Sequence, residues 1–152
     1  MYYNREMDYF EPFQEMYRVE SLNDLLIKAM KDERHDRVKY KKMMEMTNDT
    51  MVKKQIRFAY DDEGKHYKMF NQIYYNLTEK QVDIPLPTNI EKYDTLMEAV
   101  QSSIEGENNA VDLYREIFSL MTNKQMRDKL LEIITDEQEH AARFIYLYAM
   151  LK

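Results

Sequence analysis

The sequence contains no cysteine, and its 152 residues include only two glycines and three prolines. Without cysteine the chain can form neither a disulfide nor a cysteine-ligated zinc or iron–sulfur centre. Residues that interrupt helices are scarce, whereas the thirteen methionines and the many lysines, glutamates and leucines favour helices. This composition predicts an all-α protein, and the length fits one domain.

Basic runs and long apolar stretches are also missing. A net charge of −6 argues against a nucleic-acid-binding protein, which needs a basic surface to neutralise phosphates. No stretch approaches the roughly 20 apolar residues of a membrane span, and the first residues contain no apolar signal core. We therefore expect a cytoplasmic protein that binds neither nucleic acid nor a membrane.

Apolar residues recur at helical spacing in four long segments. These segments are residues 21–46, 50–77, 90 or 93 to 121, and 124–150. Ser21, followed by Asp24 three positions later, resembles a capping pair and predicts the start of the first helix. The charged run Lys39–Lys42 is interpreted as part of a solvated face.

The segments between and before these helices suggest how they are arranged. Residues 78–91 lose the helical pattern and contain Pro85 and Pro87, so we expect an extended crossover between the second and third helices. Fourteen extended residues span roughly 45 Å, the length of the neighbouring helices. Residues 1–20, rich in tyrosine and phenylalanine, are expected to form an N-terminal arm or a short helix, and residues 21–152 the bundle.

The second half of the chain repeats the first at an offset of 74 residues. Residues 22–76 align with residues 96–150 without a gap, and eight of the 55 positions are identical. The identities include every acidic or imidazole residue in the middle of an apolar stripe. These six residues are Glu33, Glu63, His66, Glu107, Glu137 and His140.

Metal binding explains these six residues better than a buried polar network, the alternative reading. A lone ionised carboxylate on a core face costs several kcal/mol or takes up a proton, and four together repel one another. Two divalent cations supply +4 against −4, and two imidazoles add nitrogen ligands. Each E-x-x-H phrase, at Glu63–His66 and Glu137–His140, places both side chains on one helical face.

On these residues the chain resembles the rubrerythrin branch of the ferritin-like superfamily over about residues 21–151. The resemblance implies a ferritin-like antiparallel four-helix bundle with the long crossover between helices two and three. It implies that Glu63 and Glu137 bridge two metal ions and that the other four residues are terminal ligands. Departures from the family are Ala110, where a further glutamate is usual, and the missing cysteines of the rubredoxin module.

Further residues have roles implied by the resemblance. Tyr40 and Tyr114 resemble tyrosines that hydrogen-bond a ligand carboxylate, and Asp62 and Asp136 are expected to orient a histidine of a neighbouring helix. Asp36, three residues after Glu33, is a candidate extra ligand. His35 is interpreted as a surface residue.

The leading functional hypothesis is a dinuclear non-haem iron protein that reacts with O2 or H2O2. It would act as a ferroxidase or peroxide reductase, with electrons from a separate donor or from Fe2+, and we expect a homodimer. A dimanganese catalase-like enzyme is the alternative enzyme, since manganese accepts the same ligands. A structural or interaction protein that binds metal without turnover is the alternative from another class.

Overall fold

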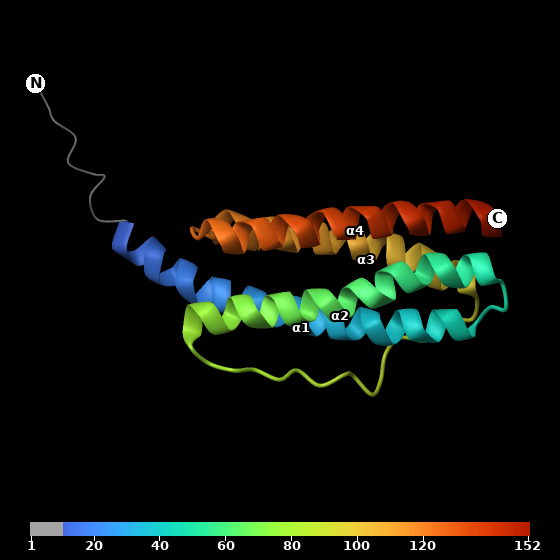
Figure 1. Cartoon of the computed structure of the whole chain (residues 1–152), viewed down its shortest axis with the longest axis horizontal. Coiled ribbons are helices and arrows are strands. Elements are labelled where there is room, and N and C mark those ends of the chain that lie inside the picture. The colour runs from blue at the N-terminus through green and yellow to red at the C-terminus, as the bar shows by residue number, and fades with distance from the viewer. Residues whose placement is uncertain (1–10) are drawn as a thin grey trace, which may run out of the picture.

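The computed structural model describes residues 11–152, which form four long helices and no strand. The helices are α1 (Glu11–Glu45), α2 (Thr50–Thr78), α3 (Leu96–Leu120) and α4 (Lys124–Leu151). α1 packs against α2 and α3, and α4 packs against α3 and α2, so the section through the bundle is square. Figure 1 shows the helices lying side by side. The predicted all-α four-helix bundle is confirmed.

The connection between α2 and α3 is the predicted crossover. It runs along the outside of the bundle (Figure 1). Two side chains of α2 and one of α1 hold it there. The Tyr67 hydroxyl accepts from the Ile84 backbone N–H at 2.9 Å, and Asn71 donates to the Val82 carbonyl. Arg34 of α1 donates through Nε to the Ile84 carbonyl at 2.9 Å.

Two predicted helix starts are wrong. α1 begins at Glu11 rather than at Ser21, so the helix takes in half of the predicted arm. α3 begins at Leu96, where Thr95 and Glu98 form a capping box, rather than at 90 or 93. The rest of the predicted arm, residues 1–10, lies outside the described residues.

Two apolar clusters fill the bundle, one toward each end. The first includes Leu26, Phe70, Tyr114 and Ile133. The second includes Tyr40, Ile56, Val100 and Phe144. On every helix, one buried glutamate lies between the residues of the first cluster and those of the second. These glutamates form a polar layer between the two clusters.

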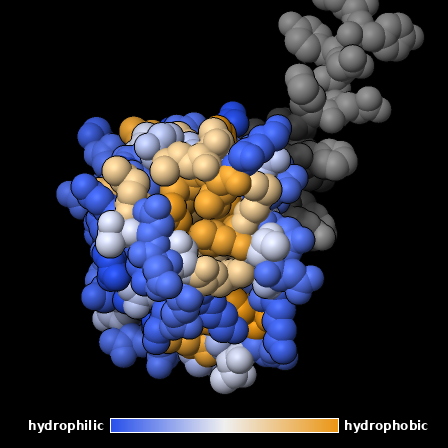
Figure 2. Space-filling view, turned by 90° about the vertical axis from the view of Figure 1, so that its right-hand side faces the viewer, coloured by the Kyte–Doolittle hydropathy of each residue, from blue (hydrophilic) through white to orange (hydrophobic). Residues whose placement is uncertain are grey.

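Several large apolar side chains are exposed on the described part of the bundle. Figure 2 looks at the end that holds the α1–α2 turn and the C-terminus, and apolar residues gather near the centre of this view. Met46 and Met51, beside that turn in the chain, and Met150, near the C-terminus, are exposed. Among the described residues, no helix is both long and apolar enough to cross a membrane.

Candidate metal centre

The polar layer is built from one glutamate of each helix and one histidine each of α2 and α4. Every one of the six is at most 2% exposed. They are Glu33 of α1, Glu63 and His66 of α2, Glu107 of α3, and Glu137 and His140 of α4. The inward stripe of each amphipathic helix carries them to the bundle axis, because residues three or four apart share a face.

The potential ligand atoms of these residues gather in two overlapping groups. One group is Glu33, Glu63, His66 and Glu137, and the other is Glu63, Glu107, Glu137 and His140. Within each group the atoms lie within 4.8 Å of one another. Glu63 and Glu137 belong to both groups, so each has a carboxylate placed to serve two adjacent positions.

One buried oxygen or nitrogen of each residue has no hydrogen-bond partner in the described part of the chain. These atoms are Glu33 Oε2, Glu63 Oε1, His66 Nδ1, Glu107 Oε2, Glu137 Oε1 and His140 Nδ1. His66 Nδ1 lies 2.9 Å from Glu137 Oε1, yet the two are not oriented as donor and acceptor. Buried polar atoms are nearly always paired. Six lone pairs converging on common points therefore fit cations.

The outer nitrogen of each histidine is held by an aspartate of the opposite E-x-x-H helix. His66 Nε2 donates to Asp136 Oδ2, and His140 Nε2 donates to Asp62 Oδ2, both at 3.0 Å. An Nε2 that keeps its proton leaves the Nδ1 lone pair of a neutral ring facing the carboxylates. This is the arrangement that orients a histidine as a metal ligand.

Two buried tyrosines hold the carboxylates of α1 and α3 in a crossed pattern. Tyr40 of α1 donates its hydroxyl to Glu107 Oε1 of α3, and Tyr114 of α3 donates to Glu33 Oε1 of α1. Each glutamate thus has one oxygen engaged by a phenol, and its other oxygen is the unpaired atom facing the group. The crossing preserves the two-fold relation of the repeat.

Burial and like charges dominate the electrostatics of the layer. Burial, with the neighbouring carboxylates second, raises the pKa of Glu63 and of Glu137 well above the usual range. Burial opposes the charge of His140, but the hydrogen bond with Asp62 and the nearby carboxylate of Glu107 raise its pKa to about 9. Without a cation the layer therefore holds protons.

No family model matches the chain. The uncharacterized protein YhjR of Bacillus subtilis strain 168 is 27% identical over 108 residues, which are 70% of this chain and 72% of that protein.

A crystal structure from Anabaena variabilis ATCC 29413 gives the fold. It is a two-domain protein containing DJ-1/ThiJ/PfpI-like and ferritin-like domains, and it superposes with a TM-score of 0.67 at 16% identity. The match covers 87% of this chain and 37% of that one. The chain has a ferritin-like fold. Its likeness to that protein stops at the fold, since the shared identity is low.

Asp36 lies outside both groups of the ferritin-like bundle. Its carboxylate is 2.9 Å from His35 Nδ1, and His35 Nε2 is 2.6 Å from Glu91 of the crossover. His35 is therefore only partly exposed and ties α1 to the crossover, which the interpretation as a surface residue missed. Asp36 follows Glu33 by three residues, yet its carboxylate contacts His35 and does not join either group of potential ligands.

The prediction that Lys39 lies on a solvated face is wrong. It is 4% exposed rather than solvated. Its ammonium donates to Ser102 Oγ at 3.2 Å and lies 5.3 Å from the centre of the Tyr93 ring. The run Lys39–Lys42 offered no signal for this, because only the packing of α3 and the crossover against α1 buries that one position.

Proposed function

We propose that this chain is a non-haem dinuclear iron protein that reacts with O2 or H2O2 as a ferroxidase or peroxide reductase. The observation that carries the proposal is the convergence of six unpaired buried atoms in two overlapping groups. A buried set of oxygen and imidazole ligands suits iron or manganese rather than a soft metal such as Cu(I).

The charge of the layer supports a pair of ions rather than one. Four glutamates carry up to four negative charges, and two divalent cations balance them. Glu33 and His66 would hold one ion, and Glu107 and His140 the other. Glu63 and Glu137 would reach both, since each belongs to both groups.

The protein residues position ligands and exclude water. Bound iron would supply the redox chemistry at this site. Asp62 and Asp136 keep the protons on the outer nitrogens of the histidines, so Nδ1 remains a ligand. Tyr40 and Tyr114 hold the two outer carboxylates. The electrons come from Fe2+ as substrate or from a separate donor.

A dimanganese centre with catalase-like activity is the second candidate, favoured by the four carboxylates of the layer. A bundle that binds metal without turnover is the third. The experiment that separates them starts from anaerobic loading with Fe2+ or with Mn2+, followed by O2 or H2O2.

We expect O2 or H2O2 to oxidise the Fe2+ bound to the chain. The change in visible absorbance and the consumption of the oxidant would measure this reaction. The matched control is the Glu63→Ala, Glu137→Ala variant, which should stay at the background rate of free Fe2+. Rapid release of O2 from H2O2 by the manganese form alone would favour the second candidate. No reaction of either form would contradict an enzymatic role.

A further inference from the structure

A hollow of about 700 Å³ lies on the outer face of α2, between α1 and α4. Its lining includes one carboxylate, that of Asp61, and five cationic side chains. The cations are Arg34, Arg37, Lys65, Lys68 and Lys129. This concentration of positive charge contrasts with the net charge of −6 of the whole chain.

One lining residue, Arg37, lies against the backbone of α2 at Gly64. Its Nη1 donates to the Tyr60 carbonyl at 3.0 Å, and its guanidinium lies 4.3 Å from the centre of the Tyr60 ring. A Cβ on Gly64 would be 2.1 Å from that Nη1, so a side chain there would displace the arginine. Glycine weakens a helix interior, and here it leaves room for the guanidinium.

Three of the five cations have no carboxylate partner among the described residues. Arg34 lies 3.7 Å from Asp83, and Lys65 lies 2.6 Å from Glu132. The unpaired ones are Arg37, Lys68 and Lys129. Cations that share a concave surface repel one another, and an anion in the hollow would relieve this.

The internal repeat shows that the bundle does not require this charge. At the 74-residue offset the five cationic positions correspond to Asn108, Val111, Glu139, Ala142 and Gln55, and Gly64 corresponds to Gln138. None of these is cationic. Arg143, which does lie on that side of the bundle, is paired with Glu139. The five cationic positions of the hollow therefore have no cationic counterparts in the repeat, whereas the metal ligands do recur.

We propose that this hollow binds a small molecule carrying a phosphate group. Arg37 would contact the phosphate through the donors it does not use on Tyr60, and Lys68 and Lys129 would add point charges. Arginine and lysine together recognise phosphate through forked and single contacts. A hollow of about 700 Å³ also falls in the range of roughly 300–1,000 Å³ of small-molecule sites. The proposal does not depend on the metal proposal, although Lys65 of the hollow also lies 3.4 Å from Asp136, which holds His66.

The two glycines of the chain provide the test. Full-length protein labelled with ¹⁵N-glycine and freed of metal should give two amide signals, and Gly106→Ala identifies them by removing one. A Cβ at Gly106 would meet nothing within 4 Å, so this variant should fold normally. On titration with pyrophosphate or ADP, we expect the Gly64 signal to move saturably with a dissociation constant of about 1 mM or lower, and the Gly106 signal to stay.

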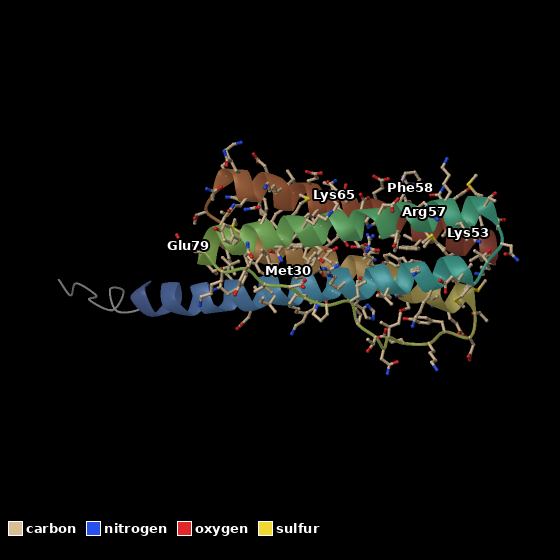
Figure 3. The ribbon with its side chains drawn as sticks, turned by 60° about the horizontal axis from the view of Figure 1, so that its bottom comes forward. Met30, Lys53, Arg57, Phe58, Lys65 and Glu79 are labelled. Carbon is tan, nitrogen blue, oxygen red and sulfur yellow. The ribbon has the colours of Figure 1, made fainter. Side chains whose placement is uncertain are left out.

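Tighter binding of ADP than of pyrophosphate would indicate that the organic part is also held, and equal binding would indicate that the phosphate group suffices. Arg37→Gln should weaken binding about tenfold or more, and so should Lys68→Gln with Lys129→Gln, two exposed positions that leave the fold intact. The control is Arg57→Gln, an exposed residue about two turns from Lys65 on α2 (Figure 3). No movement of the Gly64 signal, equal movement of both signals, or unchanged binding in both lining variants would overturn the proposal.

Discussion

Glu63 and Glu137 are the residues on which the metal centre depends most, because they alone belong to both ligand groups. At less than 3% exposure each, they gain nothing from water, and burial raises the pKa of each. A carboxylate in such a place is unfavourable for folding unless a cation or a proton accompanies it.

Replacement of both residues by glutamine should therefore abolish metal binding without unfolding the bundle. The wild-type chain should gain about 4 kcal/mol of stability at a metal concentration near 1,000 times the dissociation constant, and the variant should gain none. Urea unfolding with and without metal measures this. The control is Glu139→Gln, an exposed neighbour, which should keep the full metal effect. A metal-dependent gain in the double variant would refute the shared role of the two residues.

Tyr40 and Tyr114 give a second prediction at this scale. Each phenol also packs on a phenylalanine, with ring centres 5.1 Å apart for Tyr40 and Phe144 and 4.8 Å for Tyr114 and Phe70. Tyr→Phe at either position keeps this packing and removes the hydrogen bond to a carboxylate. Metal affinity should fall about 10- to 100-fold.

A competition assay with a chelator of known affinity measures this loss. The matched control is Tyr75→Phe, since Tyr75 is 43% exposed. If Tyr40→Phe and Tyr114→Phe both bind metal as tightly as Tyr75→Phe does, the phenols do not position the ligands.

The sequence predicted the six potential ligands, but it did not predict the contacts of the individual residues around them. The six potential ligands stand out because a charged group in an apolar stripe is conspicuous and recurs at the 74-residue offset. Lys39 and Arg37 carry no such mark. Lys39 is buried against Ser102 of α3, and Arg37 lies in the space left by Gly64 of α2. Because these partners lie on other helices, no local sequence pattern predicts the contacts.

Among the elements, α3 shows how a helix start is decided by its cap. The apolar pattern continues back to Tyr93, but the helix begins only after Thr95, whose side chain accepts from the Glu98 N–H at 3.2 Å. Thr95→Ala should lower the free energy of unfolding by about 1 kcal/mol. Thermal unfolding should shift by roughly 2–4 °C in a chain of this size.

Thr122→Ala is the control for this variant, because Asn123 rather than Thr122 caps α4. It should unfold within about 0.5 kcal/mol of the wild type. Equal losses in the two variants would mean that the capping box contributes no specific stability. The bounds of α2 and α4, by contrast, were predicted to within one residue, since Asp49 and Asn123 are visible caps beside short turns.

At the scale of the whole molecule, metal-free protein should become less stable as the pH rises. Glu63, Glu137 and His140 have pKa values raised in the folded state, so their contribution is present at low pH and is lost as the pH passes each folded value. The pKa of Glu107 is lowered by hydrogen bonds despite burial, so its contribution is constant above its usual range.

Calorimetry between about pH 5 and pH 9 should therefore show a falling melting temperature for the metal-free chain. Metal-loaded protein should not follow this decline, because the ions take the place of the protons. Parallel curves for the two forms would show that the metal does not occupy this layer.

The whole architecture was largely predictable from the chain. Four long apolar stripes, a proline-containing segment of crossover length and a repeat with one polar layer leave few alternatives to a bundle of this connectivity. The chemistry beyond metal binding is less accessible, because the same buried layer suits iron and manganese alike.

Metal analysis of the full-length chain, purified with iron and manganese both in supply, tests the central claim most directly. We expect about two transition-metal ions per chain, lost together in the Glu63→Gln, Glu137→Gln variant. A folded wild-type protein that contains neither iron nor manganese under these conditions would contradict the account.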